Sequence, residues 1–173
     1  MEIPQSPVIF AKFPTAIAGP DDEIMLPKVS KKVDYEAELA FIIGKKGKNI
    51  ARDKAYQHVA GYTIFNDVSA RDLQFSDGQW VRGKTADTFA PTGPFLVSKD
   101  VVPNPHKLDI ALKLNGEIMQ SSNTNQIIFT VPHLVSFLSQ VMTLEVGDIV
   151  STGTPPGVGA FREPAVFLKP GDE

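Results

Sequence analysis

The sequence predicts a mainly β protein with a few short helices, and two observations carry that prediction. Short apolar stretches such as VIFAKF, AELAFIIG, GPFLVS and QIIFTV alternate with turn residues along the chain, which is typical of β structure. The 13 glycines and 14 prolines are spread among these stretches and do not gather into a linker. With 173 residues, of which 42% are hydrophobic, the chain can bury one substantial core, so we expect a single domain over residues 1–173.

The predicted strands follow from residue alternation and turn chemistry. Residues 33–44, VDYEAELAFIIG, form the first clear strand, whose successive side chains point to opposite faces. Residues 62–65 form a second strand. A hairpin is predicted over LDIALKLNGEIMQ, because Asn115-Gly116 is a favoured turn pair and the apolar residues before it share one face.

One segment has helical spacing instead. In VPHLVSFLSQVM, apolar residues recur every three or four positions after Pro132, which predicts an amphipathic helix over residues 132–142. Its apolar residues are Leu134, Val135, Leu138, Val141 and Met142. Shorter helices are predicted in RDKAYQHV and SARDLQ.

The composition excludes several classes of function. The chain has no cysteine, which excludes disulfides, thiolate metal sites and a cysteine nucleophile. No apolar run approaches the roughly eighteen residues of a membrane span. The net charge is −3, and the basic clusters KVSKK and KKGK have the character of solvated turns, so nucleic-acid binding is not expected.

The start of the chain bears on location. MEIPQSPVIF has neither the basic n-region nor the apolar h-region of a signal peptide. We therefore expect a cytoplasmic protein, or a mitochondrial one if a targeting segment precedes this stretch in the whole protein.

Two glutamates stand at the start of the first predicted strand. Glu36 and Glu38 share one face, about 6.6–6.8 Å apart by strand rise, beside the apolar run AFII. Two partly buried carboxylates need water, a cationic side chain or a metal ion to remain ionised. Taken alone, such a pair is more often the solvated face of an edge strand.

A third acidic residue, Asp67, follows the second predicted strand. A short helix is predicted to begin near it, with Asn, Asp or Ser as its cap. Asp67, Arg71 and Gln74 would then lie at i, i+4 and i+7 on one helical face. The simpler interpretation is that Asp67 only caps the helix and that Arg71 is its ion-pair partner.

Two further stretches combine turn residues with side chains suited to a pocket. In RGKTADTFAPTGP, Lys84 lies between Gly83 and a turn rich in threonine and aspartate. STGTPPGVG, residues 151–159, could direct the Thr154 hydroxyl into a shared pocket, although it lacks the Lys-Ser/Thr of a phosphate-binding loop. The simpler interpretations are an exposed lysine and a rigid connector between strands.

Together these stretches resemble the fumarylacetoacetate hydrolase family. The matching motifs are FAKF with AIAGP, VDYEAELAFIIGKKGK, AGYTIFNDVSARDLQ, GKTADTFAPTGP, PHKLDIALKLNGEIMQSSNT and GDIVSTGTPPGVG, which cover nearly the whole chain. The combination of E-x-E with NDxSARDxQ and GTPxGVG is highly specific. QSSNTNQIIF is most similar to the domain-2-like branch, which includes 2-hydroxyhepta-2,4-diene-1,7-dioate isomerases.

The resemblance implies a mixed β-sandwich roll, usually a homodimer. It implies one Mg²⁺ or Mn²⁺ per subunit, held by Glu36, Glu38 and Asp67. The implied substrates are small 2-oxo acids or 1,3-diketo acids that react through a metal-stabilised enolate. The reactions are C–C hydrolysis of acylpyruvates, decarboxylation, and keto–enol or double-bond isomerisation.

The resemblance also assigns roles to the polar residues beside the acidic group. Arg71, Gln74 and Lys84 would help to bind the substrate carboxylate and the developing oxyanion. Thr154 would contact the same substrate.

The chain departs from the family pattern in one respect that concerns mechanism. Hydrolytic members carry an H-x-x-E pair before the FAKF stretch, and neither His58, His106 nor His133 replaces it. We expect that pair, and the last C-terminal strands, to lie outside residues 1–173. The alternative to an enzyme is therefore a non-catalytic module that binds a metal ion and a ligand without activating water.

Overall fold

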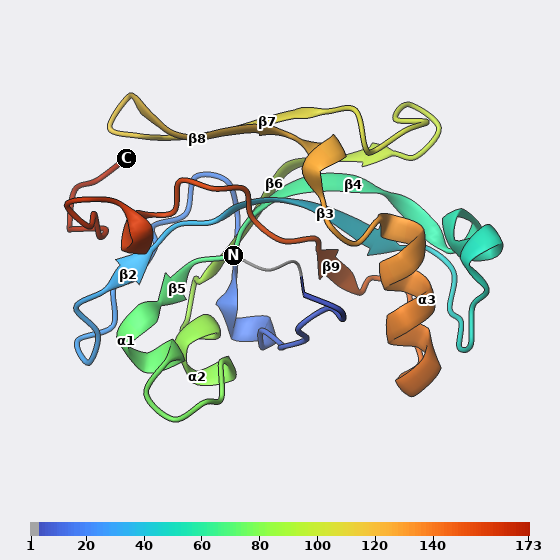
Figure 1. Cartoon of the computed structure of the whole chain (residues 1–173), viewed down its shortest axis with the longest axis horizontal. Coiled ribbons are helices and arrows are strands. Elements are labelled where there is room, and N and C mark those ends of the chain that lie inside the picture. The colour runs from blue at the N-terminus through green and yellow to red at the C-terminus, as the bar shows by residue number, and fades with distance from the viewer. Residues whose placement is uncertain (1–3) are drawn as a thin grey trace.

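A mixed five-stranded sheet forms the centre of the molecule (Figure 1). The computed structural model describes residues 4–173. The strand order is β1-β6-β4-β3-β9, with β1 parallel to β6 and all other neighbours antiparallel. The bounds are β1 Ile17–Ala18, β3 Ala37–Ile43, β4 Val59–Asn66, β6 Ala90–Ser98 and β9 Ile149–Ser151.

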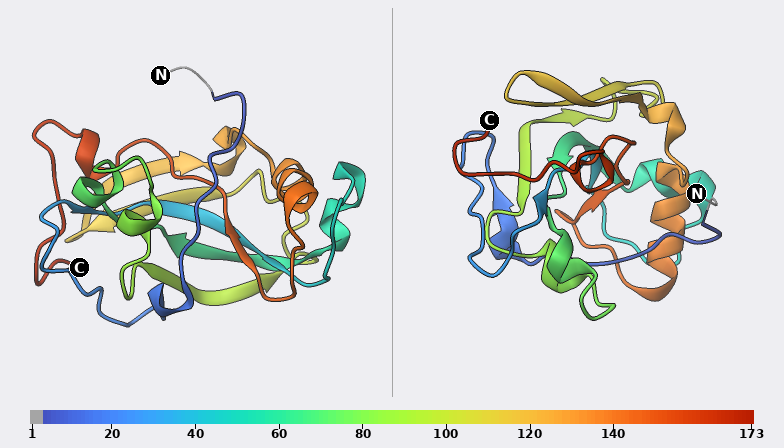
Figure 2. Two further views of the ribbon diagram at one scale, coloured as in Figure 1. Left: turned by 90° about the horizontal axis from the view of Figure 1, so that it is seen from below. Right: turned by 60° about the vertical axis from the view of Figure 1, so that its left-hand side comes forward.

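Two smaller strand pairs complete the β structure. β2, Val33–Asp34, pairs antiparallel with β5, Ser69–Ala70. β7, Asp109–Leu114, and β8, Glu117–Asn123, form the predicted hairpin, which lies along one side of the large sheet (Figures 1 and 2). Both residues of its Asn115-Gly116 turn have positive φ, 52° and 83°, as this turn requires.

The helices are few and short. α3, Val131–Val141, confirms the predicted amphipathic helix within one residue at each end. α1, Arg71–Gln74, and α2, Val81–Lys84, each have one turn and lie side by side below the β2–β5 pair (Figure 1). The 3₁₀ helices are η1 Pro14–Ala16, η2 Arg52–Gln57, η3 Thr124–Gln126 and η4 Gly159–Phe161.

The main core lies between the sheet and α3. The apolar face of α3 packs with η2 against the buried side chains of β3 and β4, and it thereby closes one end of the sheet. The core residues are Leu39, Phe41, Ile43, Ile50, Ala55, Val59, Tyr62, Val131, Leu134, Val135, Leu138 and Leu144. The prediction of a mainly β fold with few helices is confirmed. Within residues 4–173 no helix is both long and apolar enough to cross a membrane.

Two helix predictions need correction. The segment RDKAYQHV forms a 3₁₀ helix and not an α-helix. In SARDLQ the helix begins only at Arg71, with Ala70 as N-cap and no side-chain cap, because Ser69–Ala70 instead pair with Val33–Asp34. Asp67 therefore neither caps this helix nor lies on it.

Candidate metal centre

Three predicted residues converge at the start of β3. Glu36, Glu38 and Asp67 are all buried, and each offers a carboxylate oxygen that lies within 4.8 Å of the oxygens of the other two. The convergence follows from sheet register, because Ala37 pairs with Asn66 and the Asp67 N–H donates to the Glu36 carbonyl at 2.9 Å. Since β3 lies between β4 and β9, the solvated edge-strand interpretation is wrong.

Lys84 places its ammonium between two of these carboxylates. Its Nζ lies 2.9 Å from Glu36 Oε2 and 2.6 Å from Asp67 Oδ2, and its side chain is only 2% exposed. The interpretation of Lys84 as an exposed lysine is therefore wrong. Gly83 allows this position because a Cβ there would lie 2.5 Å from the Gln74 backbone nitrogen, so α2 can approach α1 closely only without a side chain at that point.

Lys12 is a further cation at this site, which sequence reasoning missed. Its Nζ lies 2.8 Å from Asp67 Oδ1. The same ammonium donates to the carbonyls of Val68, Phe89 and Lys84. Burial lowers the pKa of Lys12, although the neighbouring carboxylate of Asp67 opposes that shift. Lys12 lies within the FAKF motif, residues 10–13. The match of this motif to the family could have indicated that Lys12 belongs to the site.

Arg71 is held between two acidic residues and not beside Asp67. Its Nη1 lies 2.6 Å from Glu36 Oε1, and its Nε donates to Asp34 Oδ2 at 2.9 Å. Nη1 also donates to Gln74 Oε1 at 3.1 Å. The ion pair of Arg71 with Asp67, which the simpler interpretation expected, is absent from the ion pairs of residues 4–173. Asp34 was also missed, although it precedes Glu36 by two residues at the end of β2. The predicted strand over residues 33–44 is divided at residues 35–36 into β2 and β3.

Glu38 is the carboxylate of the triad whose negative charge is least compensated by neighbouring groups. Its Oε2 accepts hydrogen bonds from the Ser151 hydroxyl and, at 2.8 Å, from the Gly153 N–H. Within residues 4–173 no cationic side chain pairs with it. Burial, together with the charges of Asp67 and Glu36, raises the pKa of Glu38 to about 8.

Thr154 serves the backbone beside this site. Its hydroxyl donates to the Ala37 carbonyl at 3.0 Å and accepts from Gln120 Nε2 at 2.8 Å. Gln120 Oε1 in turn accepts the Ala37 N–H at 2.9 Å. These bonds tie the GTPPGVG turn to the first residue of β3. The predicted contact of Thr154 with substrate stays a prediction.

Aromatic side chains border the lysine. The Lys84 ammonium lies 4.8 Å from the centroid of the Phe10 ring, within the range of a cation–π interaction. The Phe10 and Trp80 ring centroids are 5.7 Å apart. Phe10 comes from the N-terminal segment that also supplies Lys12, drawn in dark blue in Figure 2, so this segment contributes to the site twice.

The donor set fits a hard divalent cation. Asp34, Glu36, Glu38 and Asp67 give four buried carboxylates against three cationic side chains, Lys12, Arg71 and Lys84. Asp67 Oδ1 is buried and accepts no hydrogen bond, although Lys12 lies within ion-pair distance of it. Carboxylate oxygens are the ligands that Mg²⁺ and Mn²⁺ prefer. A cation held by the acidic triad would therefore favour the ionised form of Glu38, whose pKa burial and the neighbouring carboxylates raise.

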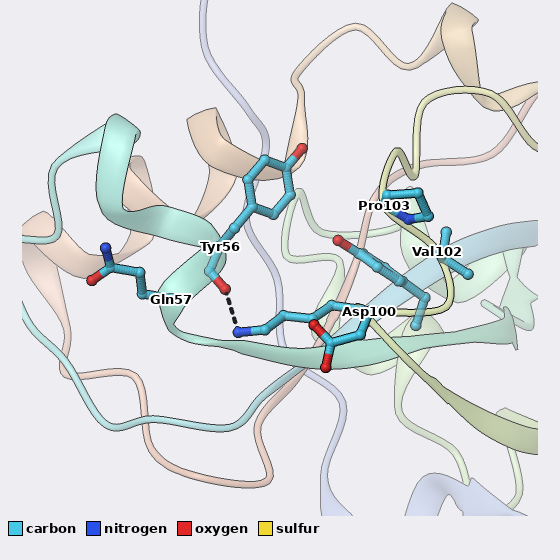
Figure 3. Close-up of a pocket in the computed structure, with 7 residues that line it drawn as sticks. Tyr56, Gln57, Asp100, Val102 and Pro103 are labelled. Carbon is cyan, nitrogen blue, oxygen red and sulfur yellow. Dashed lines mark hydrogen bonds between the residues drawn. The ribbon is translucent and has the colours of Figure 1, made fainter.

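One cavity of the structure lies away from the acidic triad. It has a volume of about 500 Å³ and is lined by Tyr56, Gln57, Tyr62, Lys99, Asp100, Val102 and Pro103 (Figure 3). None of its lining residues belongs to the acidic triad. Lys99 uses its ammonium to bind the Tyr56 carbonyl at 2.8 Å. The acidic triad is thus defined by its buried charge and not by cavity size.

Fold and site together define a β-rich protein with a buried cluster of carboxylate oxygens, the donor type that divalent cations prefer. Over residues 1–173 the chain matches the family described as fumarylacetoacetate (FAA) hydrolase C-terminal. The chain belongs to the fumarylacetoacetate hydrolase family, which confirms the resemblance.

Relatives within this family carry enzymatic names. The mitochondrial oxaloacetate tautomerase Fahd2a of Rattus norvegicus is 55% identical over 174 residues, covering 100% of this chain and 56% of the relative. The mitochondrial oxaloacetate tautomerase FAHD2A of Bos taurus is 57% identical over 173 residues, covering 99% and 55%. The chain thus spans about half the length of these curated relatives.

Solved structures agree with the fold. A fumarylacetoacetate hydrolase from Exiguobacterium antarcticum superposes with a TM-score of 0.92 at 43% identity, covering 95% of this chain and 60% of that chain. A 2-hydroxyhepta-2,4-diene-1,7-dioate isomerase from Mycobacterium marinum gives a TM-score of 0.90 at 45% identity, covering 98% and 63%. The predicted fold class is confirmed.

Proposed function

We propose that this chain carries the metal-binding catalytic centre of a 2-oxo acid tautomerase. The observation that supports the proposal most directly is the burial of Glu36, Glu38 and Asp67 beside the Lys84 ammonium. The names of the relatives, oxaloacetate tautomerase and hydroxyheptadienedioate isomerase, favour keto–enol or double-bond isomerisation over C–C hydrolysis. Mg²⁺ or Mn²⁺ is the proposed cation, and a homodimer stays a prediction.

The proposal divides the polar residues by what they contact. Glu36, Glu38 and Asp67 would hold the cation, which supplies Lewis-acid polarisation of the substrate's 2-oxo group when bound. Lys84 would donate a hydrogen bond to the oxygen that gains negative charge during enolisation. Burial excludes water from this ammonium, which strengthens its interaction with the developing charge.

Arg71 and Gln74 contact each other and Glu36 in this structure. Their proposed part is to orient Glu36. A further part, binding of the substrate carboxylate, would require Arg71 to exchange one of these contacts for substrate. A non-catalytic module is less well supported, because a purely structural ion would not need the buried Lys84 between two of its ligands.

Thermal unfolding tests the metal and the substrate class together. The chain is scanned with and without Mn²⁺ or Mg²⁺, each in the presence and absence of oxalate, a planar mimic of a pyruvate enolate. A ligand present at 100 times its dissociation constant adds about 2.7 kcal/mol to stability. Stabilisation by metal, with a further oxalate effect only when metal is present, supports the proposal. No shift with either metal contradicts it.

Turnover is tested with oxaloacetate, whose enol form absorbs in the ultraviolet. The tautomerase proposal predicts metal-dependent acceleration of the decay of the enol signal, which chelation abolishes. Decarboxylation is distinguished by the appearance of pyruvate. Metal and oxalate binding without any acceleration would favour the non-catalytic module.

A further inference from the structure

Three acidic residues alternate in sequence from the end of β2 to the start of β3, but only two of them join the acidic triad. Asp34, Glu36 and Glu38 stand at i, i+2 and i+4, and all are buried. The triad combines Glu36 and Glu38 with Asp67 and leaves Asp34 out. The contacts of Asp34 explain this difference and assign it another part.

The Asp34 carboxylate is fully occupied by donors. Its Oδ1 accepts the Gly159 N–H at 2.7 Å and the Tyr35 N–H at 2.9 Å. Its Oδ2 accepts the Ala160 N–H at 2.9 Å and Arg71 Nε at 2.9 Å. The residue is 0% exposed. Asp34 therefore has no oxygen left for an ion, and its charge is directed at Arg71.

Asp34 determines which nitrogens of Arg71 can contact Glu36. Arg71 Nε and Nη2 both face Asp34 Oδ2, each at 2.9 Å. Only Nη1 reaches Glu36, at 2.6 Å from Oε1. An unshared guanidinium favours a two-pronged pair with a carboxylate. By engaging one edge of Arg71, Asp34 leaves Glu36 Oε2 free of the arginine.

We propose that Asp34 is a positioning residue that holds Arg71 in a one-pronged contact with Glu36 and so keeps Glu36 available to a divalent cation. The inference rests on the proposed metal-binding function. Loss of the Asp34 charge should weaken binding of the cation for two reasons. Arg71 becomes free to take both oxygens of Glu36, and the centre loses a negative charge that attracts the cation.

The test measures Mn²⁺ affinity by isothermal titration calorimetry, so it does not depend on turnover. Asp34→Asn keeps side-chain oxygen for the loop N–H groups but removes the charge. We expect Mn²⁺ binding to weaken about 10- to 100-fold, the range for residues that orient metal ligands. The double variant Asp34→Asn with Arg71→Met removes the competitor, so its Mn²⁺ affinity should return toward that of the wild type.

The control is Asp72→Asn, an acidic residue of α1 that hydrogen-bonds Ser30 and Lys31 and not the acidic triad. Its Mn²⁺ affinity should equal that of the wild type. Circular dichroism checks the fold of each variant. If Asp34→Asn alone does not fold, the double variant, in which both charges of the pair are gone, is compared directly with the wild type.

The outcomes separate the two proposals. Wild-type chain that binds no Mn²⁺ overturns the proposed function, and this inference with it. Wild-type binding together with unchanged binding by Asp34→Asn overturns this inference alone. Weak binding by Asp34→Asn that Arg71→Met does not restore also overturns it, because Asp34 would then only support the loop. Weak Mn²⁺ binding by the double variant, if that variant is folded, would also overturn this inference.

Discussion

The Lys84 ammonium donates to Asp67 Oδ2 at 2.6 Å. The same nitrogen lies 2.9 Å from Glu36 Oε2, so it bridges two of the three proposed metal ligands. A divalent cation bound to these oxygens would take the place of the ammonium. Metal binding would therefore release the Lys84 side chain for a substrate oxygen, which links formation of the metal centre to activation of its neighbour.

Replacing Lys84 by Met should destabilise the metal-free chain. Removal of one partner from a buried ion pair leaves an uncompensated charge and costs about 3 kcal/mol. Because Mn²⁺ can neutralise the same carboxylates, its addition should restore more stability to Lys84→Met than to the wild type. Chemical denaturation with and without Mn²⁺ measures both effects, and turnover should be lost in either condition.

A matched lysine variant controls for loss of positive charge. Lys46 pairs with Glu145 on the surface, where both side chains are more than half exposed, and such pairs contribute about 0–1 kcal/mol. Lys46→Met should thus unfold at nearly the wild-type denaturant concentration. Equal destabilisation by the two variants would show that the position of Lys84 between the carboxylates has no special effect.

Glu38→Gln should separate metal binding from folding. The amide oxygen of Gln can accept hydrogen bonds from Ser151 and Gly153 as Glu38 does. The side chain at position 38 then carries no buried charge that needs compensation. We expect the metal-free midpoint to stay the same or rise, while the stabilisation by Mn²⁺ disappears. Thermal scans at pH 7 measure both quantities. A variant that still gains the full metal shift would remove Glu38 from the ligand set.

Gly159→Ala should disrupt the loop that holds Asp34. An added Cβ would lie 1.8 Å from the Val166 carbonyl and 2.7 Å from Asp34 Oδ1. Overpacking of this kind costs about 1–3 kcal/mol, and displacement of Asp34 should also weaken Mn²⁺ binding. At Gly19 the nearest atom to an added Cβ is the Asp22 carboxylate oxygen at 3.2 Å, so Gly19→Ala is the control. Normal Mn²⁺ affinity in Gly159→Ala would disconnect the loop from the site.

Asp72 provides a pH-dependent prediction away from the metal centre. Partial burial acts to raise its pKa, but hydrogen bonds from the Lys31 N–H and the Ser30 hydroxyl outweigh that effect and lower it. A pKa that is lower in the folded state adds stability above the unfolded pKa, and this stability is lost as pH falls through the folded value. The difference in denaturation midpoint between wild type and Asp72→Asn should therefore be present at pH 7 and shrink below about pH 4. A constant difference would contradict the assignment.

The acidic triad was predicted from the family resemblance, because local patterns alone favoured a solvated strand face and a helix cap. Local patterns were sufficient to predict β3, β4, the hairpin and the long helix, but they wrongly gave VIFAKF and QIIFTV the character of strands. They were insufficient for Lys12 and Asp34, because the partners of these residues are distant in sequence. Lys12 binds carbonyls 56 to 77 positions away, and no alternation or spacing rule reports such contacts. The start of α1 was predicted too early for a related reason, since pairing of Ser69–Ala70 with β2 overrode the local capping signal.

The hydrogen bond from the Ala160 N–H to Asp34 joins positions 126 residues apart, and this separation has a consequence for kinetics. Closing so long a loop costs entropy before any contact is gained, so contacts of this kind form slowly. The loop at Gly159 and Ala160 that holds Asp34, and with it the contact of Arg71 with Glu36, is therefore completed only after this long loop has closed. Interactions that form after the transition state chiefly retard unfolding. Bound metal should accordingly lengthen the lifetime of the native state and leave the refolding rate nearly unchanged.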